Sequence, residues 1–125
     1  MGYLLHHAIV VTGFMPEVGA LRDAVLAAAR VRSLSHVVSQ LLPAACNGWQ
    51  TFLVGPDGSK EGYRLSHEGD ALRDEVITLC EATRYEDGSS PVDWVEIQYG
   101  DDDGETYCTR DSDEPSRRSR EEDSS

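Results

Sequence analysis

The sequence has no long hydrophobic run and few features of a secreted or metal-binding protein. Its longest apolar stretches are a few residues, far short of the roughly 20 needed to span a bilayer. The N-terminus has neither a basic region nor a long apolar stretch, so we expect no signal peptide. The three cysteines, Cys46, Cys80 and Cys108, are odd in number and form no CxxC pair. They indicate neither a disulfide framework nor a zinc site, and we expect a cytoplasmic protein.

Positive charge is also scarce. The 125 residues contain 11 basic side chains, of which only Lys60 is a lysine, against 23 acidic ones, for a net charge of −12. Such a chain repels phosphate backbones and anionic lipid surfaces. We therefore expect no direct nucleic-acid binding and no membrane partner.

Apolar residues are absent from the C-terminal segment of the sequence. They make up 39% of the chain, which is enough for one core in a chain of this length. From Asp111 to Ser125 there is no apolar residue, so this segment cannot bury enough surface to offset its ordering entropy. We expect one domain over residues 1–110 and a disordered acidic, serine-rich tail over residues 111–125.

Strand and helix patterns alternate before that boundary. Apolar spacing predicts one helix over residues 16–32 and a second helix capped by Ser66. Asn47-Gly48 is a strong hairpin signal between two strands. Strands are predicted over residues 3–12, 36–42, 49–54, 92–99 and 105–110.

This order predicts an α+β fold. The sequence β-α-β-β-α-β is the split arrangement of ferredoxin-like folds, here with an extra C-terminal strand. Two helices would cover one face of an antiparallel sheet, whose first and third strands lie in the middle. A different α+β sandwich is the main alternative.

Few residues suggest chemistry. His6 and His7 are neighbours on a strand and point to opposite faces, so they cannot readily share one metal ion. Asp101, Asp102 and Asp103 with Glu105 form the densest acidic cluster, but their spacing does not match a calcium-binding EF-hand loop. A solvated turn explains the same residues. We predict no catalytic, cofactor or metal site, and no cofactor.

The uncovered face of the predicted sheet is the more informative feature. Residues that alternate along a strand share a face. If Val95 and Ile97 face the helices with the apolar residues of the third strand, the opposite residues gather on the open face. Large apolar patches on small soluble proteins often mark interfaces. The predicted partner-binding residues are His6, Val10, Leu53, Trp49 and Trp94.

Three stretches carry a resemblance to other proteins. They are residues 3–12 (YLLHHAIVVT), 47–62 (NGWQTFLVGPDGSKEG) and 85–101 (YEDGSSPVDWVEIQYGD). The chain resembles small uncharacterised proteins encoded by phages of actinobacteria, over most of residues 3–104. The resemblance implies a phage or prophage protein in a bacterial cytoplasm, and it supplies no activity and no site residues.

Our leading hypothesis is a non-enzymatic acidic module that binds a protein through the open face, either as a dimer or on a host factor. One alternative is a DNA-mimicking inhibitor, in which acidic side chains replace phosphates on a host nucleic-acid-binding protein. The other alternative is a small enzyme or a ligand or metal binder that uses His6 and the acidic loop of residues 101–105.

Overall fold

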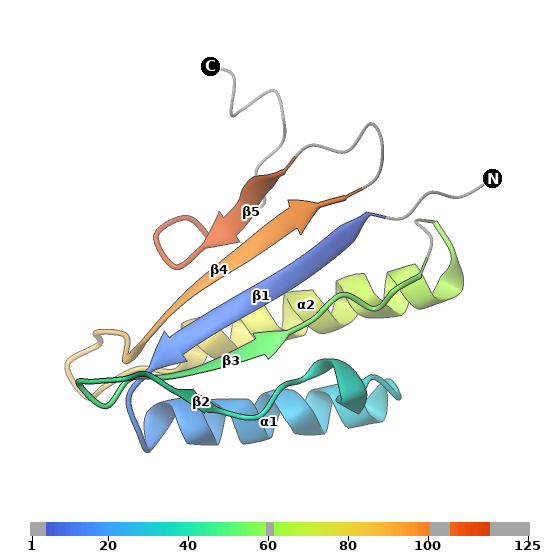
Figure 1. The fold of residues 1–125 in the computed structure, drawn as a ribbon. Helices are drawn as coiled ribbons and strands as arrows, with labels where there is room; N and C mark the ends of the chain where they lie inside the picture. The colour runs from blue at the N-terminus through green and yellow to red at the C-terminus, as the bar shows by residue number, and fades with distance from the viewer. Residues whose placement is uncertain (1–4, 60–61, 101–105, 116–125) are drawn as a thin grey trace.

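The computed structural model describes residues 5–59, 62–100 and 106–115. It has a five-stranded sheet and two long helices, which confirms the α+β class (Figure 1). The elements follow the chain in the order β1 (His6–Gly13), α1 (Glu17–Val31), a 3-10 turn (Ser35–Val37), β2 (Leu42–Pro43), β3 (Gln50–Val54), α2 (Arg64–Ala82), β4 (Val92–Tyr99) and β5 (Tyr107–Asp111).

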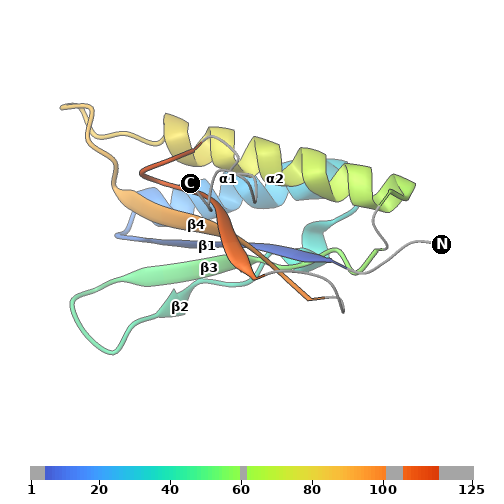
Figure 2. The ribbon, with the colours of Figure 1, turned by 90° about the horizontal axis from the view of Figure 1, so that it is seen from above.

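The sheet has the order β2-β3-β1-β4-β5, and all of these neighbours pair antiparallel. β1 is the middle strand of the five, between β3 and β4, because β5 extends the sheet beyond β4. Both helices lie on one side of the sheet, and no helix lies on its other side in the described residues (Figure 2). The described residues therefore form two layers, and none of their helices covers the second face of the sheet, which we call the open face.

The core lies between the helices and the sheet. Alternate residues of β1 and β3 point toward the helices, as their period-two apolar pattern predicts. Each helix presents one apolar stripe to them, as its 3.6-residue periodicity predicts. Fully buried members of this core include Ile9, Val11, Val18, Val25, Phe52, Val54, Leu72 and Val76.

The predicted strand over residues 36–42 is wrong. Residues 35–37 form a 3-10 turn, and the strand itself is reduced to two residues, Leu42 and Pro43. The chain still runs beside β3, through a single bridge from Val38 to Val54. The Ser39 hydroxyl accepts a hydrogen bond from the Leu53 N–H at 2.8 Å, in the place of a backbone carbonyl. A local side chain thus replaces regular strand pairing here.

Two predicted boundaries also move. α2 begins at Arg64, and Ser66 is a buried residue of its first turn rather than the cap, which is Tyr63. β5 includes Asp111, and the Ser112 N–H donates to the Trp94 carbonyl at 3.0 Å. The start of the predicted tail is thus hydrogen-bonded to the sheet, while residues 116–125 lie outside the described part.

Candidate functional site

The uncovered face of the sheet is the candidate site, and the strand register defines it. One cross-strand row joins Leu53 of β3, Val10 of β1 and Val95 of β4. The next row joins Ala8 to Ile97. We call these five residues the open-face patch. They are apolar, and four of them are half-buried or exposed, with Leu53 36% exposed.

The rim of the open face is polar or aromatic. At one end, His6 pairs with Tyr99, and their ring centroids are 5.2 Å apart. At the other end, Thr12 lies opposite Thr51, and their hydroxyls are 2.9 Å apart. Asp93 lies beyond Thr12 on β4. The patch is therefore an uncharged strip with polar ends, the distribution expected of an interface core and rim.

The predicted orientation of β4 is wrong. Val95 and Ile97 are half-buried residues of the open face, and Trp94 points toward the helices. Trp94 is 3% exposed and packs in the core, and its indole N–H donates to the Glu81 carboxylate of α2 at 3.1 Å. Trp94 therefore cannot anchor a partner, and Val95 and Ile97 take its place in the open-face patch.

A buried ion pair explains why the less apolar side of β4 faces inward. Glu96 lies two residues after Trp94 on the same face and is 0% exposed. Both of its carboxylate oxygens accept from the Arg110 guanidinium of β5, each at 2.8 Å. The Thr109 hydroxyl donates to the same carboxylate at 2.6 Å. Because a buried carboxylate needs such partners, β5 makes this orientation of β4 possible.

The Glu96–Arg110 ion pair is part of a larger network that includes side chains of α2. Arg110 also donates to Asp74 at 2.9 Å. Burial alone would lower the pKa of Arg110, but its bonds with Glu96 and Asp74 raise that pKa above its usual value. Arg73, which is 3% exposed, lies with its Nε 3.8 Å from Glu96 and contacts Asp57 and Asp70. The network thus ties α2 to β4 and β5 and acts as a structural element under the helix layer.

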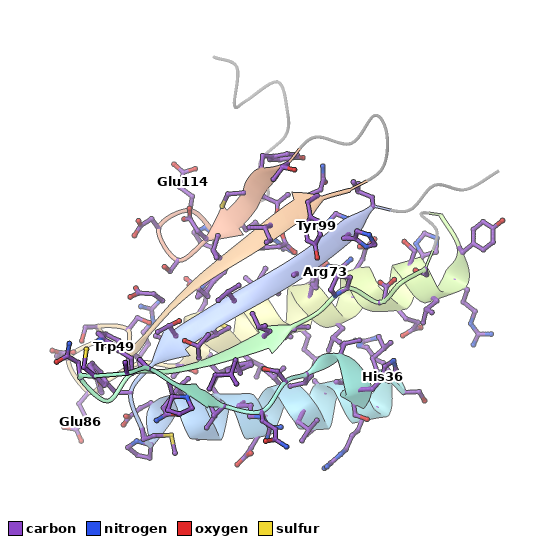
Figure 3. All side chains as sticks on the ribbon, in the orientation of Figure 1. His36, Trp49, Arg73, Glu86, Tyr99 and Glu114 are labelled. Carbon is purple, nitrogen blue, oxygen red and sulfur yellow. The ribbon has the colours of Figure 1, made fainter. Side chains whose placement is uncertain are left out.

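The predicted site residues Trp49 and His6 do not belong to the open-face patch. Trp49 lies at the end of the sheet, where it stacks on Phe14 with ring centroids 3.8 Å apart. Trp49 and Tyr99 lie toward opposite ends of the sheet (Figure 3). His6 lies on the open face as predicted, at its rim. The structure therefore brings Val10 and Leu53 into the patch, with His6 at its edge and Trp49 outside it.

The predicted acidic loop, Asp101 to Asp103 with Glu105, lies outside the described residues. Among the residues that are described, no group of three or more His, Cys, Asp or Glu side chains is placed to hold a metal ion. Burial raises the pKa of the Cys80 thiol to about 12, with a further contribution from Glu81.

Comparisons with known proteins add no identification: no family model, no curated protein and no solved structure matches the chain. None of the helices in the described ranges is long and apolar enough to cross a membrane. The open-face patch and the buried ion pair are therefore interpreted from their geometry alone.

Proposed function

We propose that this protein is a non-enzymatic association module that forms a homodimer by stacking two copies of its open sheet face. The observation that carries the proposal is the open-face patch, an apolar strip on three neighbouring strands that no helix of the described residues covers (Figure 2). Sheets that stack face to face bury such strips between them.

The size of the face fits a weak to moderate dimer. β1 has eight residues, and at ~3.3 Å per residue and ~4.8 Å between strands a five-stranded face covers on the order of 500 Å². Two copies would together bury about 1,000 Å², which is the lower end of specific interfaces. A dimer of this kind would depend on protein concentration.

Three segments of the same chain are poor alternative covers. In the loop after β3, Asp57 contacts Arg73 of α2, which places that part of the loop on the helix side of the sheet. β5 extends the sheet at its edge. Residues 111–125 contain no apolar side chain, so they would gain little by burying Val10 or Ile97. A second copy supplies the apolar surface that these segments lack.

The net charge of the chain predicts how dimerisation depends on salt concentration. Two copies that each carry −12 repel one another, whereas the contact itself is apolar. Added salt screens the repulsion, with a Debye length that falls from about 30 Å at 0.01 M to about 3 Å at 1 M. Dimerisation should therefore strengthen as salt rises.

The test is sedimentation velocity of the full chain between about 0.05 and about 1 M sodium chloride. We expect the dimer fraction to rise with salt. Ile97→Lys should remain monomeric throughout, because it places a charge inside the contact. Val31→Lys is the matched control: it adds the same charge at a residue that is 87% exposed on α1, and it should dimerise as the parent chain does.

A monomer at high salt and high concentration would contradict the proposal. Unchanged dimerisation of Ile97→Lys would also contradict it, because the contact would then lie elsewhere. The DNA-mimic hypothesis predicts the opposite salt dependence, since binding of an acidic surface to a basic partner weakens as salt rises.

Two further proposals concern the type of fold and the source of the protein. We propose that the fold is ferredoxin-like, which is supported by the order β2-β3-β1-β4 and by the two helices on one face. The two-residue β2 and the added β5 are its departures from that pattern. We also propose a phage-encoded protein of a bacterial cytoplasm, on the sequence resemblance alone.

A further inference from the structure

The charge of the chain is divided unequally along its length. Residues 1–59 contain three acids, Glu17, Asp23 and Asp57, and three arginines, Arg22, Arg30 and Arg32, so they are neutral. Residues 60–125 contain the other 20 acids and the other eight basic residues, and they carry the entire net charge of −12.

In the fold, the neutral and the acidic halves of the sequence lie on two different sides of the molecule. The neutral half supplies β1, α1, β2 and β3, which form one side of the sheet and its helix layer. The acidic half supplies β4 and β5 on the other side, under α2. α2 contacts that side through Trp94–Glu81 and Arg110–Asp74. The boundary between the two charge regions therefore runs between β1 and β4 (Figure 1).

Two copies can stack their open faces symmetrically in two ways, which differ in whether the acidic halves lie over each other. A two-fold axis perpendicular to the strands places β4 and β5 of one copy over β4 and β5 of the other. A two-fold axis parallel to the strands places β4 and β5 over the partner's β1, β3 and β2. Both arrangements bury the open-face patch, because Val10 on the central strand lies near its middle.

We propose that the dimer uses the axis parallel to the strands, so that the acidic half of each copy lies over the neutral half of the other. Stacked sheets are about 10 Å apart, which is close to the Debye length of about 8 Å at physiological salt. The acids of α2 lie behind the sheet, but Asp93 and Asp111 lie on its open face, so repulsion between these side chains in two overlaid acidic halves is only partly screened. The parallel axis separates these halves and lets Asp93 and Asp111 face uncharged strands.

The contacts of this arrangement follow from the register. Leu53 of β3 and Val95 of β4 lie on either side of Val10 in one row. The two-fold axis then brings Leu53 of each copy against Val95 of its partner. The β2 edge of each copy lies near the partner's β5 edge, and the two β2 edges lie far apart.

This inference rests on the proposed dimer, and spin labels at the two edges test it. Leu42 on β2 pairs with Thr51 of the open face and is 52% exposed, and Cys108 on β5 pairs with Ile97 of the open face. One variant carries Leu42→Cys with Cys46→Ser and Cys108→Ser. A second variant carries Cys46→Ser alone and retains Cys108. Cys80 is 1% exposed and stays unlabelled in both.

Sedimentation of each labelled chain at high salt first establishes whether it dimerises. In the proposed dimer, labels on two β2 edges are separated by four strand spacings and one sheet spacing, roughly 20 Å or more. Two Cys108 labels are similarly far apart. Leu42 lies in the row of Thr12 and Cys108 in the row of Ala8, four residues or ~13 Å apart along the strands. Together with a sheet spacing of about 10 Å, mixed dimers of the two variants should show a shorter distance of roughly 16 Å.

The outcomes separate the two proposals. A dimer with a short distance between two Leu42→Cys labels, and a long distance in mixed dimers, would overturn the arrangement and leave the proposed function intact. A parent chain that stays monomeric at high salt would overturn both.

Discussion

The helix-covered face of the sheet holds a carboxylate and a guanidinium side by side, whereas the uncovered face holds valine, isoleucine and leucine. On β4 the two faces alternate, with Trp94 and Glu96 inside and Val95 and Ile97 outside. Glu96 is accommodated inside because Arg110 and Thr109 satisfy its oxygens. Hydrophobicity alone therefore does not identify the covered face of a strand. The partners that each side chain finds on neighbouring strands decide it.

The largest effect is expected from removal of the buried carboxylate. Glu96→Gln removes the buried counter-charge of Arg110 and leaves the guanidinium only the exposed Asp74 carboxylate, so we expect a loss of about 3 kcal/mol in the free energy of unfolding by urea. Glu75→Gln is the control, because Glu75 pairs with Arg32 at the surface and such pairs contribute less than about 1 kcal/mol. Equal losses for the two variants would show that the Glu96 pair is not a buried structural element.

Gly69 of α2 lies at a close contact on the helix-covered side of the sheet. A Cβ at this position would overlap the Asp57 carboxylate, which lies over the helix and contacts Arg73. We expect Gly69→Ala to lower the free energy of unfolding by about 1 to 3 kcal/mol. Gly19→Ala in α1 meets only the flexible end of Met15. It should be neutral or stabilising, since alanine is the better helix former. A stabilising Gly69→Ala would place the loop away from α2.

The covered face should also be sensitive to alkali through Cys80. Burial raises the pKa of its thiol from the usual value near 9 to about 12, so the folded state keeps a proton that the unfolded state loses. This contribution is fully present below pH 9 and is lost as pH rises from 9 toward 12. Between pH 9 and pH 11 the parent chain should lose about 1 to 2 kcal/mol more than Cys80→Ala in urea unfolding. Parallel pH curves for the two proteins would indicate that the thiol is not buried.

The smallest effect is expected on the open face. Ile97→Thr should lower the stability of the monomer by less than about 1 kcal/mol, because this side chain is already in contact with water. Ile9→Thr makes the same exchange at a fully buried position of the neighbouring strand, and it should cost about 2 kcal/mol or more. Thermal unfolding at low salt and low concentration compares the two. Similar losses would mean that the open face is covered within one copy.

The sequence predicts the parts of this molecule in which local pattern and packing agree. The helix over residues 16–32 is observed over Glu17–Val31, and the inward residues of β1 and β3 are those that their alternation predicts. The orientation of β4 could not be predicted in the same way. Its decisive contact joins Glu96 to Arg110, 14 residues later on another strand. Within the candidate site, the positions of Val10 and Leu53 on the open face could be predicted from the alternation in their own strands. The prediction for Trp94 is wrong because the two faces of β4 are exchanged relative to the predicted ones.

The irregular outer edge of β3 has a consequence for how far assembly can proceed. Beside β3, the chain makes one bridge at Val38, uses the Ser39 hydroxyl as an acceptor and ends its pairing at Pro43, which has no N–H. At the opposite edge, β5 is short and its pairing with β4 is broken by a bulge. Within the part of the chain that the structure describes, neither edge offers a long regular row of free donors and acceptors on which another strand could add. These edges therefore disfavour growth into fibrils by strand addition, and the proposed dimer would leave neither copy with an open face for a third.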